Sequence, residues 1–421
     1  MKVGGSLRVP GDKSISHRSL MLAALGDGES RITGILESAD VHSTAGVLRA
    51  LGAEIPALSE DITVRGVGLR GLRAPAHALD CGNSGTTTRL MAGIVAGLPI
   101  TATFVGDASL SRRPMRRIAK PLEAMGARLE LPPHGGLPMV VHGGALKDIV
   151  WHSEVASAQV KSAILLAGVV SGVRATVDEP APTRDHTERM LSARGIDIVR
   201  RGTRIELAPG HVCLRSLDTV VPADPSSAAF FAGLAALADE GALSLTDVCV
   251  NETRTGFLET LRRMGVTVEF ARDRLSGGEW ISSVVVRPPR DALRGVQVGA
   301  EIVPSMIDEL PLLACLATRA EGETVITGAA ELRVKESDRI AAVVANLRAI
   351  GAEASELDDG MRILGSRSPL CGSIVTQGDH RLAMSFGVLG ALPGNDITID
   401  ERDCVAVSYP GFWSDLATVV R

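Results

Sequence analysis

The sequence predicts an α/β protein of two domains that together hold six related units, three in each domain. Three observations support this fold class. A helix followed by a Gly and a strand occurs six times, a second series of Gly-terminated helices lies between those copies, and 421 residues are too many for one ordinary domain. A repeat of this kind indicates one structural unit that was copied along the chain.

The first pattern begins with small or polar residues, continues as an Ala/Leu-rich helix of about three turns, and ends in a Gly and a β-branched strand. Its copies span Ser14 to Ile35, Ser84 to Val105, Ser157 to Val177, Pro225 to Val248, Ser305 to Ile326 and Asp379 to Ile399. Each copy therefore predicts one helix and the strand that follows it.

In the second series an amphipathic helix ends in a Gly before a strand. The glycines are Gly52, Gly126, Gly195, Gly265 and Gly351, with separations of 74, 69, 70 and 86 residues. A sixth helix, PGFWSDLATVV, closes the chain. Two prolines in VVPADP, between the third and fourth copies, predict the exchange between domains near Val221 to Pro225.

The composition excludes several functional classes. A net charge of −5 and 3% aromatic residues argue against nucleic-acid binding, which needs a basic surface and stacking platforms. The six cysteines and nine histidines show no metal-ligand spacing, so we expect no metal, and we expect the cysteines to be small core residues. The first ten residues lack the apolar core of a secretory signal and no apolar stretch could span a membrane, so we expect a cytoplasmic protein.

The first chemical motif is PGDKSISHR. A strand, a turn and then a helix would place Lys13 and Ser14 at a helix N-terminus, where free N–H groups favour a phosphate, with Arg18 on the same face as Ser14. Asp12 replaces the Gly that a nucleotide-binding P-loop requires. A well-capped amphipathic helix with solvated cations is the alternative.

Further candidates follow along the first half of the chain. In GNSGTTTR, Gly85 belongs to a turn of small residues that would let an anion approach the backbone. Arg113 precedes Pro114, which we expect at the first position of a helix. Ser157 and Gln159 open an apolar helix, although Ser is also a common N-cap. Arg184 could bind an anion, and Asp185 to Glu188 could equally form a capping box.

The segment ELRVKESDRI is expected to start an apolar helix that brings two cations and a carboxylate together, because Lys335 and Arg339 are four residues apart and Glu336 and Arg339 three apart. Asp308 and Arg381 supply another acid and another cation. Separately, such groups would be surface ion pairs of little energetic value. In one cleft they could move protons beside bound anions.

The motifs PGDKSISHR, GNSGTTTR, RRPM, SAQVKSAILLAG, TRDHTERML, VKESDRI and GDHRLAMSF together resemble the family of 5-enolpyruvylshikimate-3-phosphate synthases, which are enolpyruvyl transferases, along essentially the whole chain. The resemblance implies a two-domain inside-out α/β barrel of six βαβαββ-type repeats, with helices inside and sheets outside. The implied domains are 11–222, and 223–421 together with 1–10.

The resemblance also implies the reaction. The enolpyruvyl group of phosphoenolpyruvate passes to the 5-hydroxyl of shikimate 3-phosphate and phosphate leaves, without a cofactor or a metal. The partners implied are these small molecules, with neither nucleic acid nor membrane, and we expect a monomer. The herbicide glyphosate is expected to occupy the phosphoenolpyruvate site. Two charged substrates need several cations to offset their repulsion.

Residue roles are carried over from the family's motifs. The resemblance assigns shikimate 3-phosphate to Lys13, Ser14, Arg18, Ser157, Gln159, Arg184, Asp308 and Lys335. It assigns phosphoenolpyruvate to Lys13, Gly85, Arg113, Gln159, Arg339 and Arg381. Asp308 resembles the base for the 5-hydroxyl, Glu336 the group that exchanges a proton with the methylene carbon, and Lys13 a catalytic cation. Val407 stands where some members carry a further Lys ligand.

Two other functions were weighed. An enolpyruvyl transferase acting on UDP-N-acetylglucosamine would need a Cys as proton donor in the loop GDASLSRRP, where Ala108 stands. A catalytically silent metabolite-binding protein would be weakened by Asp308 and Glu336, because acids among bound anions oppose binding. Phosphate release with each acceptor separates these possibilities.

Overall fold

The structure, a computed structural model that describes residues 1–210 and 213–420, contains two compact units. Unit 1 comprises Met1–Pro10, Pro222–Arg274 and Trp280–Arg421, and unit 2 comprises Gly11–Val221 and Leu275–Glu279. The chain therefore starts in unit 1, crosses to unit 2 after Pro10, and returns after Val221.

The described residues form six sheets, three in each unit. In unit 2 the first sheet has the strand order β12 (Thr219–Val220), β2 (Asp27–Thr33), β3 (Asp61–Val67). The second has the order β4 (Leu79–Asp80), β5 (Thr101–Val105), β7 (Met139–His142), β6 (Arg128–Glu130). The third has the order β8 (Ile149–His152), β9 (Ala175–Asp178), β11 (Arg204–Leu207), β10 (Ile198–Arg201). In unit 1 the first sheet has the strand order β1 (Lys2–Leu7), β13 (Glu240–Cys249), β15 (Glu279–Arg287), β14 (Thr267–Ser276). The second has the order β16 (Gln297–Val298), β17 (Glu323–Ile326), β19 (Gly360–Leu364), β18 (Glu353–Leu357). The third pairs β20 (Cys371–Ile374) with β21 (Asp396–Ile399).

Every sheet opens with a parallel pair of strands. A parallel pair needs a crossover connection, and a helix supplies it. The helices of unit 2 are α1 (Lys13–Leu25), α2 (Ala39–Ala50), α3 (Gly85–Ala96), α4 (Ala108–Arg112), α5 (Arg116–Met125), α6 (Ala158–Ser171) and α7 (His186–Ala193). Those of unit 1 are α8 (Pro225–Ala236), α9 (Gly256–Arg263), α10 (Leu310–Ala317), α11 (Arg339–Ala349), α12 (His380–Gly390) and α13 (Phe412–Val419).

In each unit, one strand pairs with a strand that is far away in the sequence. Strand β1, at the start of the chain, pairs in parallel with β13 of unit 1, from Lys2 opposite Glu240 to Leu7 opposite Leu245. Strand β12, just before the chain enters α8, pairs in parallel with β2 of unit 2. The parallel pair that opens the first sheet of each unit is thus completed by a segment distant in sequence.

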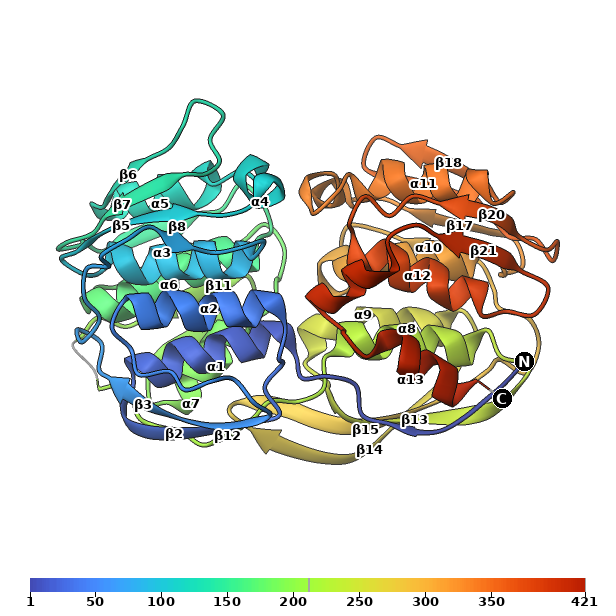
Figure 1. Cartoon of the computed structure of the whole chain (residues 1–421), viewed down its shortest axis with the longest axis horizontal. Helices are drawn as coiled ribbons and strands as arrows, with labels where there is room; N and C mark the ends of the chain where they lie inside the picture. The colour runs from blue at the N-terminus through green and yellow to red at the C-terminus, as the bar shows by residue number, and fades with distance from the viewer. Residues whose placement is uncertain (211–212, 421) are drawn as a thin grey trace. The chain divides into compact units, whose positions relative to one another are not determined.

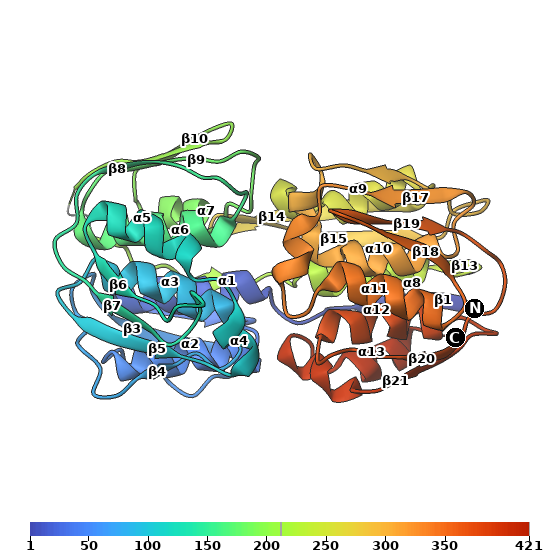
Figure 2. The same ribbon diagram turned by 90° about the horizontal axis from the view of Figure 1, so that it is seen from above.

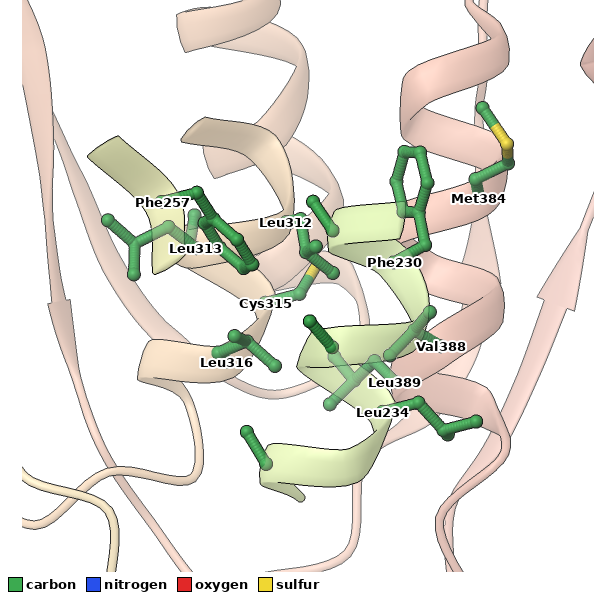
Figure 3. Close-up of a cluster of buried hydrophobic side chains, with 14 of the residues drawn as sticks. Phe230, Leu234, Phe257, Leu312, Leu313, Cys315, Leu316, Met384, Val388 and Leu389 are labelled. Atoms are coloured by element: carbon green, nitrogen blue, oxygen red, sulfur yellow. The ribbon is translucent and has the colours of Figure 1, made fainter. Parts of the chain in front are cut away.

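Within each unit the helices occupy the interior and the sheets the outside (Figures 1 and 2). All residues of α8 and α10 are buried, as expected for helices that are apolar on every face. In unit 1, side chains from α8, α9, α10 and α12 pack together, including Phe230, Phe257, Leu312 and Val388 (Figure 3). The predicted inside-out α/β arrangement is confirmed.

The five glycines predicted to end helices all have positive φ angles, between 89° at Gly195 and 112° at Gly126. In this region of backbone conformation a side chain is strained and Gly is not. The sequence pattern therefore identified the helix ends correctly, and the predicted sixth helix is α13.

Three expectations about helix starts and buried cysteines were wrong. Helix α10 begins at Leu310 rather than near Ser305, because two 3₁₀ turns, η2 (Val303–Ser305) and η3 (Ile307–Glu309), precede it. Pro114 does not start a helix, since it lies in the link between α4 and α5. Cys213 and Cys371 are exposed and Cys404 is half-buried, whereas Cys81, Cys249 and Cys315 lie in the core as expected.

No helix among residues 1–210 and 213–420 is both long and apolar enough to cross a membrane.

Candidate active site

The sequence-derived candidates divide between the two units. Unit 2 carries Lys13, Ser14, Arg18, Gly85, Arg113, Ser157, Gln159 and Arg184, and unit 1 carries Asp308, Lys335, Glu336, Arg339 and Arg381.

Helix α1 begins as predicted, with Lys13 and Ser14 in its first turn. The buried carboxylate of Asp12 caps the helix by accepting a hydrogen bond of 2.8 Å from the N–H of Ile15. This explains the Asp where a P-loop has Gly. The Lys13 Nζ donates to Asp40 Oδ2 at 3.0 Å, so α2 holds the ammonium group at the start of α1.

Arg18 lies one turn further along α1 and is buried. Its guanidinium donates to Thr187 Oγ1 at 2.8 Å, to Ser162 Oγ at 2.9 Å and to the Ser14 carbonyl at 3.0 Å. Burial lowers the pKa of Arg18 to about 10, still far above neutral pH, while Glu188 opposes that shift. Its hydrogen bonds within the described residues go to hydroxyls and a carbonyl, so it is a buried cation suited to an anion.

Gly85 is the first residue of α3, and Ser84 caps this helix by accepting from the N–H of Thr87 at 3.1 Å. A Cβ added to Gly85 would lie 2.8 Å from Arg89 Nη1 and 3.6 Å from Arg113 Nη1. The α3 turn is therefore lined by two guanidinium groups that approach its backbone closely. This is the side-chain economy that the motif predicted.

Gln159 and Arg89 form a polar bridge between α6 and α3. Arg89 Nη1 donates to Gln159 Oε1 at 2.6 Å, and Gln159 Nε2 donates to Thr86 Oγ1 at 3.0 Å. Both ends of the Gln159 amide are therefore oriented toward the start of α3. The bridge joins a residue expected to bind substrate to one that the prediction passed over.

Arg113 follows α4 and is buried beside Asn83. Its Nη2 donates to Asn83 Oδ1 at 2.6 Å, and Asn83 Nδ2 donates to Asp107 Oδ2, also at 2.6 Å. Asn83 therefore connects the turn before α3 to the short helix α4. The sequence motif identified this asparagine without assigning it a partner.

Ser157 occupies the N-cap position of α6, but its side chain makes no capping hydrogen bond. Within the described residues, helix α7 begins without the capping box proposed for Asp185 and Glu188, because the side chain of its N-cap residue, Asp185, makes no capping hydrogen bond. Asp185 instead accepts from Arg189 at 2.9 Å and Arg200 at 3.0 Å. The Glu188 side chain turns inward to a buried lysine, so neither acid can serve the helix end.

That lysine is Lys161 of α6, which has no solvent exposure. Its Nζ lies 2.9 Å from Glu179 Oε2 and 2.8 Å from Glu188 Oε1. Burial raises the pKa of Glu188, with Lys161 opposing. Glu179 and Glu188 lie on either side of Arg184 in the sequence, so their ion pairs with Lys161 attach both ends of this segment to α6. The positive charge of Arg184 also lowers the pKa of Arg18. Lys161 is thus a buried structural cation.

In unit 1, Asp308 lies in the 3₁₀ turn η3 and is surrounded by cations. Its Oδ1 is 3.3 Å from Arg339 Nη1 and 3.6 Å from Lys335 Nζ, and its Oδ2 is 3.9 Å from Arg381 Nη2. Lys335 is not in a helix, because η4 (Ala330–Val334) ends before it and α11 begins at Arg339. The expected first helical turn is wrong, yet Asp308 still brings the predicted cations together.

Arg339 is almost fully buried and contacts three carboxylates. It donates to Asp379 from Nε at 2.8 Å and from Nη2 at 3.2 Å, and its Nη2 also donates to Glu336 Oε2 at 2.7 Å. Its third carboxylate partner is Asp308. Burial alone would lower the pKa of Arg339, but Asp379 and Glu336 raise it. Arg339 is a permanent cation beside both predicted proton-transfer acids.

Asp379 anchors this cluster. It caps α12 by accepting from the N–H of Arg381 at 2.9 Å, and Ser337 donates to it at 3.1 Å. Burial would raise the pKa of Asp379, but Arg339 lowers it below its ordinary value. The side chain of Arg381 donates to the Asp308 carbonyl at 3.2 Å. Helix α12 and turn η3 are thus connected through Arg381 and Asp308.

Three residues of these clusters were not selected from the sequence. Arg89 lies in a motif that was recognised, and its spacing from Gly85 was a usable signal. Asp379 was noted only as part of a helix start. Asp40 belongs to no motif considered, because its role depends on contact between α1 and α2.

The two clusters can bind anions and move protons. Unit 2 supplies mainly cations, whereas in unit 1 the carboxylates of Asp308 and Glu336 share one guanidinium. The described residues contain no group of three potential His, Cys, Asp or Glu ligands that could hold a metal.

Comparison with known proteins gives consistent matches over the chain. The family model for EPSP synthase (3-phosphoshikimate 1-carboxyvinyltransferase) matches residues 1–416. A 3-phosphoshikimate 1-carboxyvinyltransferase from Sulfurihydrogenibium sp. is 47% identical over 425 residues, covering 100% of this chain and 98% of that protein. One from Halorhodospira halophila is 49% identical over 410 residues, covering 97% and 92%.

Solved structures agree. EPSP synthase from Acinetobacter baumannii has a TM-score of 0.87 and 43% identity, covering 99% of this chain and 95% of that one. The enolpyruvyl transferase NikO from Streptomyces tendae, at 20% identity and a TM-score of 0.77, is similar in fold.

Proposed function

This chain belongs to the EPSP synthase family, and from that membership we propose that it transfers the enolpyruvyl group of phosphoenolpyruvate to the 5-hydroxyl of shikimate 3-phosphate and releases phosphate. It is then a transferase, a 3-phosphoshikimate 1-carboxyvinyltransferase, in the shikimate pathway toward chorismate and the aromatic amino acids. The observation that carries the proposal is the Arg339 cluster, in which one buried guanidinium donates to the carboxylates of both Asp308 and Glu336.

The proposed chemistry is addition followed by elimination. Glu336 protonates C3 of phosphoenolpyruvate, Asp308 accepts the proton of the 5-hydroxyl, and the oxygen attacks C2. The tetrahedral intermediate then returns one proton from its C3 methyl group to Glu336 as the C2–O bond to phosphate breaks, which restores the C2=C3 double bond and releases phosphate, whose charge Lys13 offsets. Positioned acids and bases of this kind each contribute about 10²- to 10⁴-fold to the rate.

The proposed binding roles keep the family assignment. Shikimate 3-phosphate is bound by Lys13, Ser14, Arg18, Ser157, Gln159, Arg184, Asp308 and Lys335, and phosphoenolpyruvate by Lys13, Gly85, Arg113, Gln159, Arg339 and Arg381. Two features support these roles. Arg18 is a buried cation whose hydrogen bonds, within the described residues, go to no carboxylate. The hydroxyl of Ser157, although at the N-cap position, makes no hydrogen bond that caps α6.

The protein works in the cytoplasm as a monomer on these two small molecules, without a cofactor. Glyphosate competes with phosphoenolpyruvate for the turn at Gly85. Nucleic acid and membranes are not partners.

The test is phosphate release from phosphoenolpyruvate, measured with shikimate 3-phosphate, with UDP-N-acetylglucosamine and without an acceptor. We expect release with shikimate 3-phosphate alone. Release with the nucleotide sugar would identify the other transferase, and tight binding of shikimate 3-phosphate without turnover would identify a silent binding protein.

A further inference from the structure

A series of short hydrogen bonds runs through the interior of unit 2, near the starts of α1, α2 and α3. His17 Nδ1 lies 2.6 Å from Thr44 Oγ1, Thr44 Oγ1 lies 2.7 Å from Thr87 Oγ1, and the Thr87 hydroxyl donates to Ser84 Oγ at 2.8 Å. All four side chains have essentially no solvent exposure. The series therefore connects three helices without contact with water.

The direction of donation along the series follows from counting protons. A hydroxyl has one proton, and in the Thr87–Ser84 pair, at 2.8 Å, Thr87 is the donor. Its proton is therefore available neither to Thr44 nor to the Asp40 carbonyl at 3.5 Å. Thr87 can then only accept from Thr44, and Thr44 can only accept from His17. The imidazole must therefore carry its proton on Nδ1.

The other ring nitrogen of His17 agrees with this tautomer. Nε2 is buried and has no hydrogen-bond partner in the part of the chain that the structure describes. Burial, with help from Lys13 and Arg18 and against the opposing effect of Asp40, lowers the pKa of His17 to about 3. The ring is thus neutral around neutral pH.

This series of hydrogen bonds, from His17 to Ser84, lies next to residues proposed to bind phosphoenolpyruvate. His17 and Thr44 are each four residues beyond the ion pair of Lys13 with Asp40, so the two contacts between α1 and α2 lie one turn apart. At the other end, Ser84 caps α3 and precedes Gly85. The series therefore fixes the Lys13 ammonium relative to the Gly85 turn.

We propose that His17 is a positioning residue for phosphoenolpyruvate, which acts through Thr44, Thr87 and Ser84 by donating from Nδ1. The inference rests on the proposed function, because it adds a residue to that reaction. Arg18 is oriented by its own bonds to Ser162, Thr187 and Ser14, so His17 should matter little for shikimate 3-phosphate.

Two substitutions of His17 distinguish the ring nitrogens. His17→Asn places an amide where Nδ1 lies and can keep the donor, whereas His17→Gln places it near Nε2 and breaks the series. We expect His17→Gln to raise the KM for phosphoenolpyruvate about tenfold, the effect of one lost buried hydrogen bond, and to leave the KM for shikimate 3-phosphate unchanged. His17→Asn should stay within about threefold of the natural protein in both constants.

Two further variants complete the kinetic test. Thr44→Val breaks the same series, so it should match His17→Gln and add nothing to it in the double variant. The matched control is Ser19→Ala, which removes another buried hydroxyl of α1 that has no hydrogen-bond partner within the described residues, and no change in either KM is expected.

Nitrogen NMR of ¹⁵N-histidine-labelled natural protein provides a second measurement, for which the His17→Asn variant serves only to assign the signals of His17. The signals lost in His17→Asn should show a protonated Nδ1 and an unprotonated Nε2 that do not titrate around neutral pH. A proton on Nε2 would overturn the proposal, as would equal rises in both KM values or a Gln variant as good as the Asn variant. Failure of the proposed function would look different, because the natural protein itself would release no phosphate.

Discussion

At the scale of single residues, substitution of Glu336 tests the proposed proton transfer to phosphoenolpyruvate. Replacing it by Gln keeps the hydrogen-bonding shape beside Arg339 but removes the proton that the reaction needs. We expect turnover to fall at least about 10²-fold, the usual contribution of a general acid, and shikimate 3-phosphate affinity to change only a few-fold. Steady-state kinetics and calorimetry measure both, with the exposed Glu353→Gln as control. Near-normal turnover would exclude Glu336 as the acid.

Gly85→Ala tests the turn that two guanidinium groups approach. The new methyl would lie 2.8 Å from Arg89 Nη1, which is the end of a flexible side chain, so folding should be little affected. Displacing Arg89 also disturbs its bond to Gln159. Overpacking of about 1–3 kcal/mol should weaken glyphosate about ten- to a hundredfold, and the smaller substrate less. Inhibition constants and KM values decide this, and a natural protein resistant to millimolar glyphosate would contradict it.

The buried neutral His17 predicts acid lability. Its pKa is about 6.5 unfolded and about 3 folded, so below pH about 6.5 the unfolded state binds a proton that the folded state does not, and stability falls with pH. The slope is about 1.4 kcal/mol per pH unit, or about 2 kcal/mol between pH 6.5 and 5. His17→Asn should lose that much less between pH about 7.5 and 5 in urea unfolding. The exposed His77→Asn is the control, and equal losses in all three proteins would disprove the effect.

At the scale of elements, α3 and α6 approach each other so closely that a Gly is required at a helix position where Ala would ordinarily be more stable. A Cβ on Gly93 of α3 would lie 2.3 Å from the Ala163 carbonyl oxygen of α6, and backbone cannot move aside cheaply. Ala is normally about 1 kcal/mol better than Gly inside a helix. Here Gly93→Ala should instead destabilise by about 1–3 kcal/mol.

The matched control is Gly46→Ala in α2. This glycine is exposed and a Cβ there would meet nothing within 4 Å, so the propensity gain of about 1 kcal/mol should appear in full. Melting temperatures should therefore move in opposite directions for the two variants. A rise in both would mean that the helices can separate.

At the scale of the whole molecule, unit 1 depends on the first residues of the chain. Val3 in β1 is buried in the unit 1 core and pairs with Gly241 of β13. Val3→Asp would place an unpaired charge there, at a cost of several kcal/mol. Hydrogen exchange should accelerate in β13 and α8 of unit 1 while α3 and α6 of unit 2 stay protected. Exposed Lys2→Ala is the control, and uniform loss of protection in both units would contradict this division.

Much of the fold was predictable because the repeat is local. Periodicity, helix starts and the glycines with positive φ depend on neighbours within one turn, so helix and strand order could be predicted from the residues alone. The late start of α10 and the separate helix α4 could not be. Short 3₁₀ turns and single-turn helices have too few residues to show a period.

The sequence by itself determined the six units, their order and the residue types that bind anions, and the motifs selected most members of both clusters. Only the tertiary structure decided which residues meet. Asp40 joins Lys13, Asp379 joins Arg339 and Lys161 is withdrawn into an ion pair, although nothing in their local sequence distinguishes them from solvated charges. The physical reason is that the role of a charge depends on its burial and its partner, and both are set by packing between distant helices.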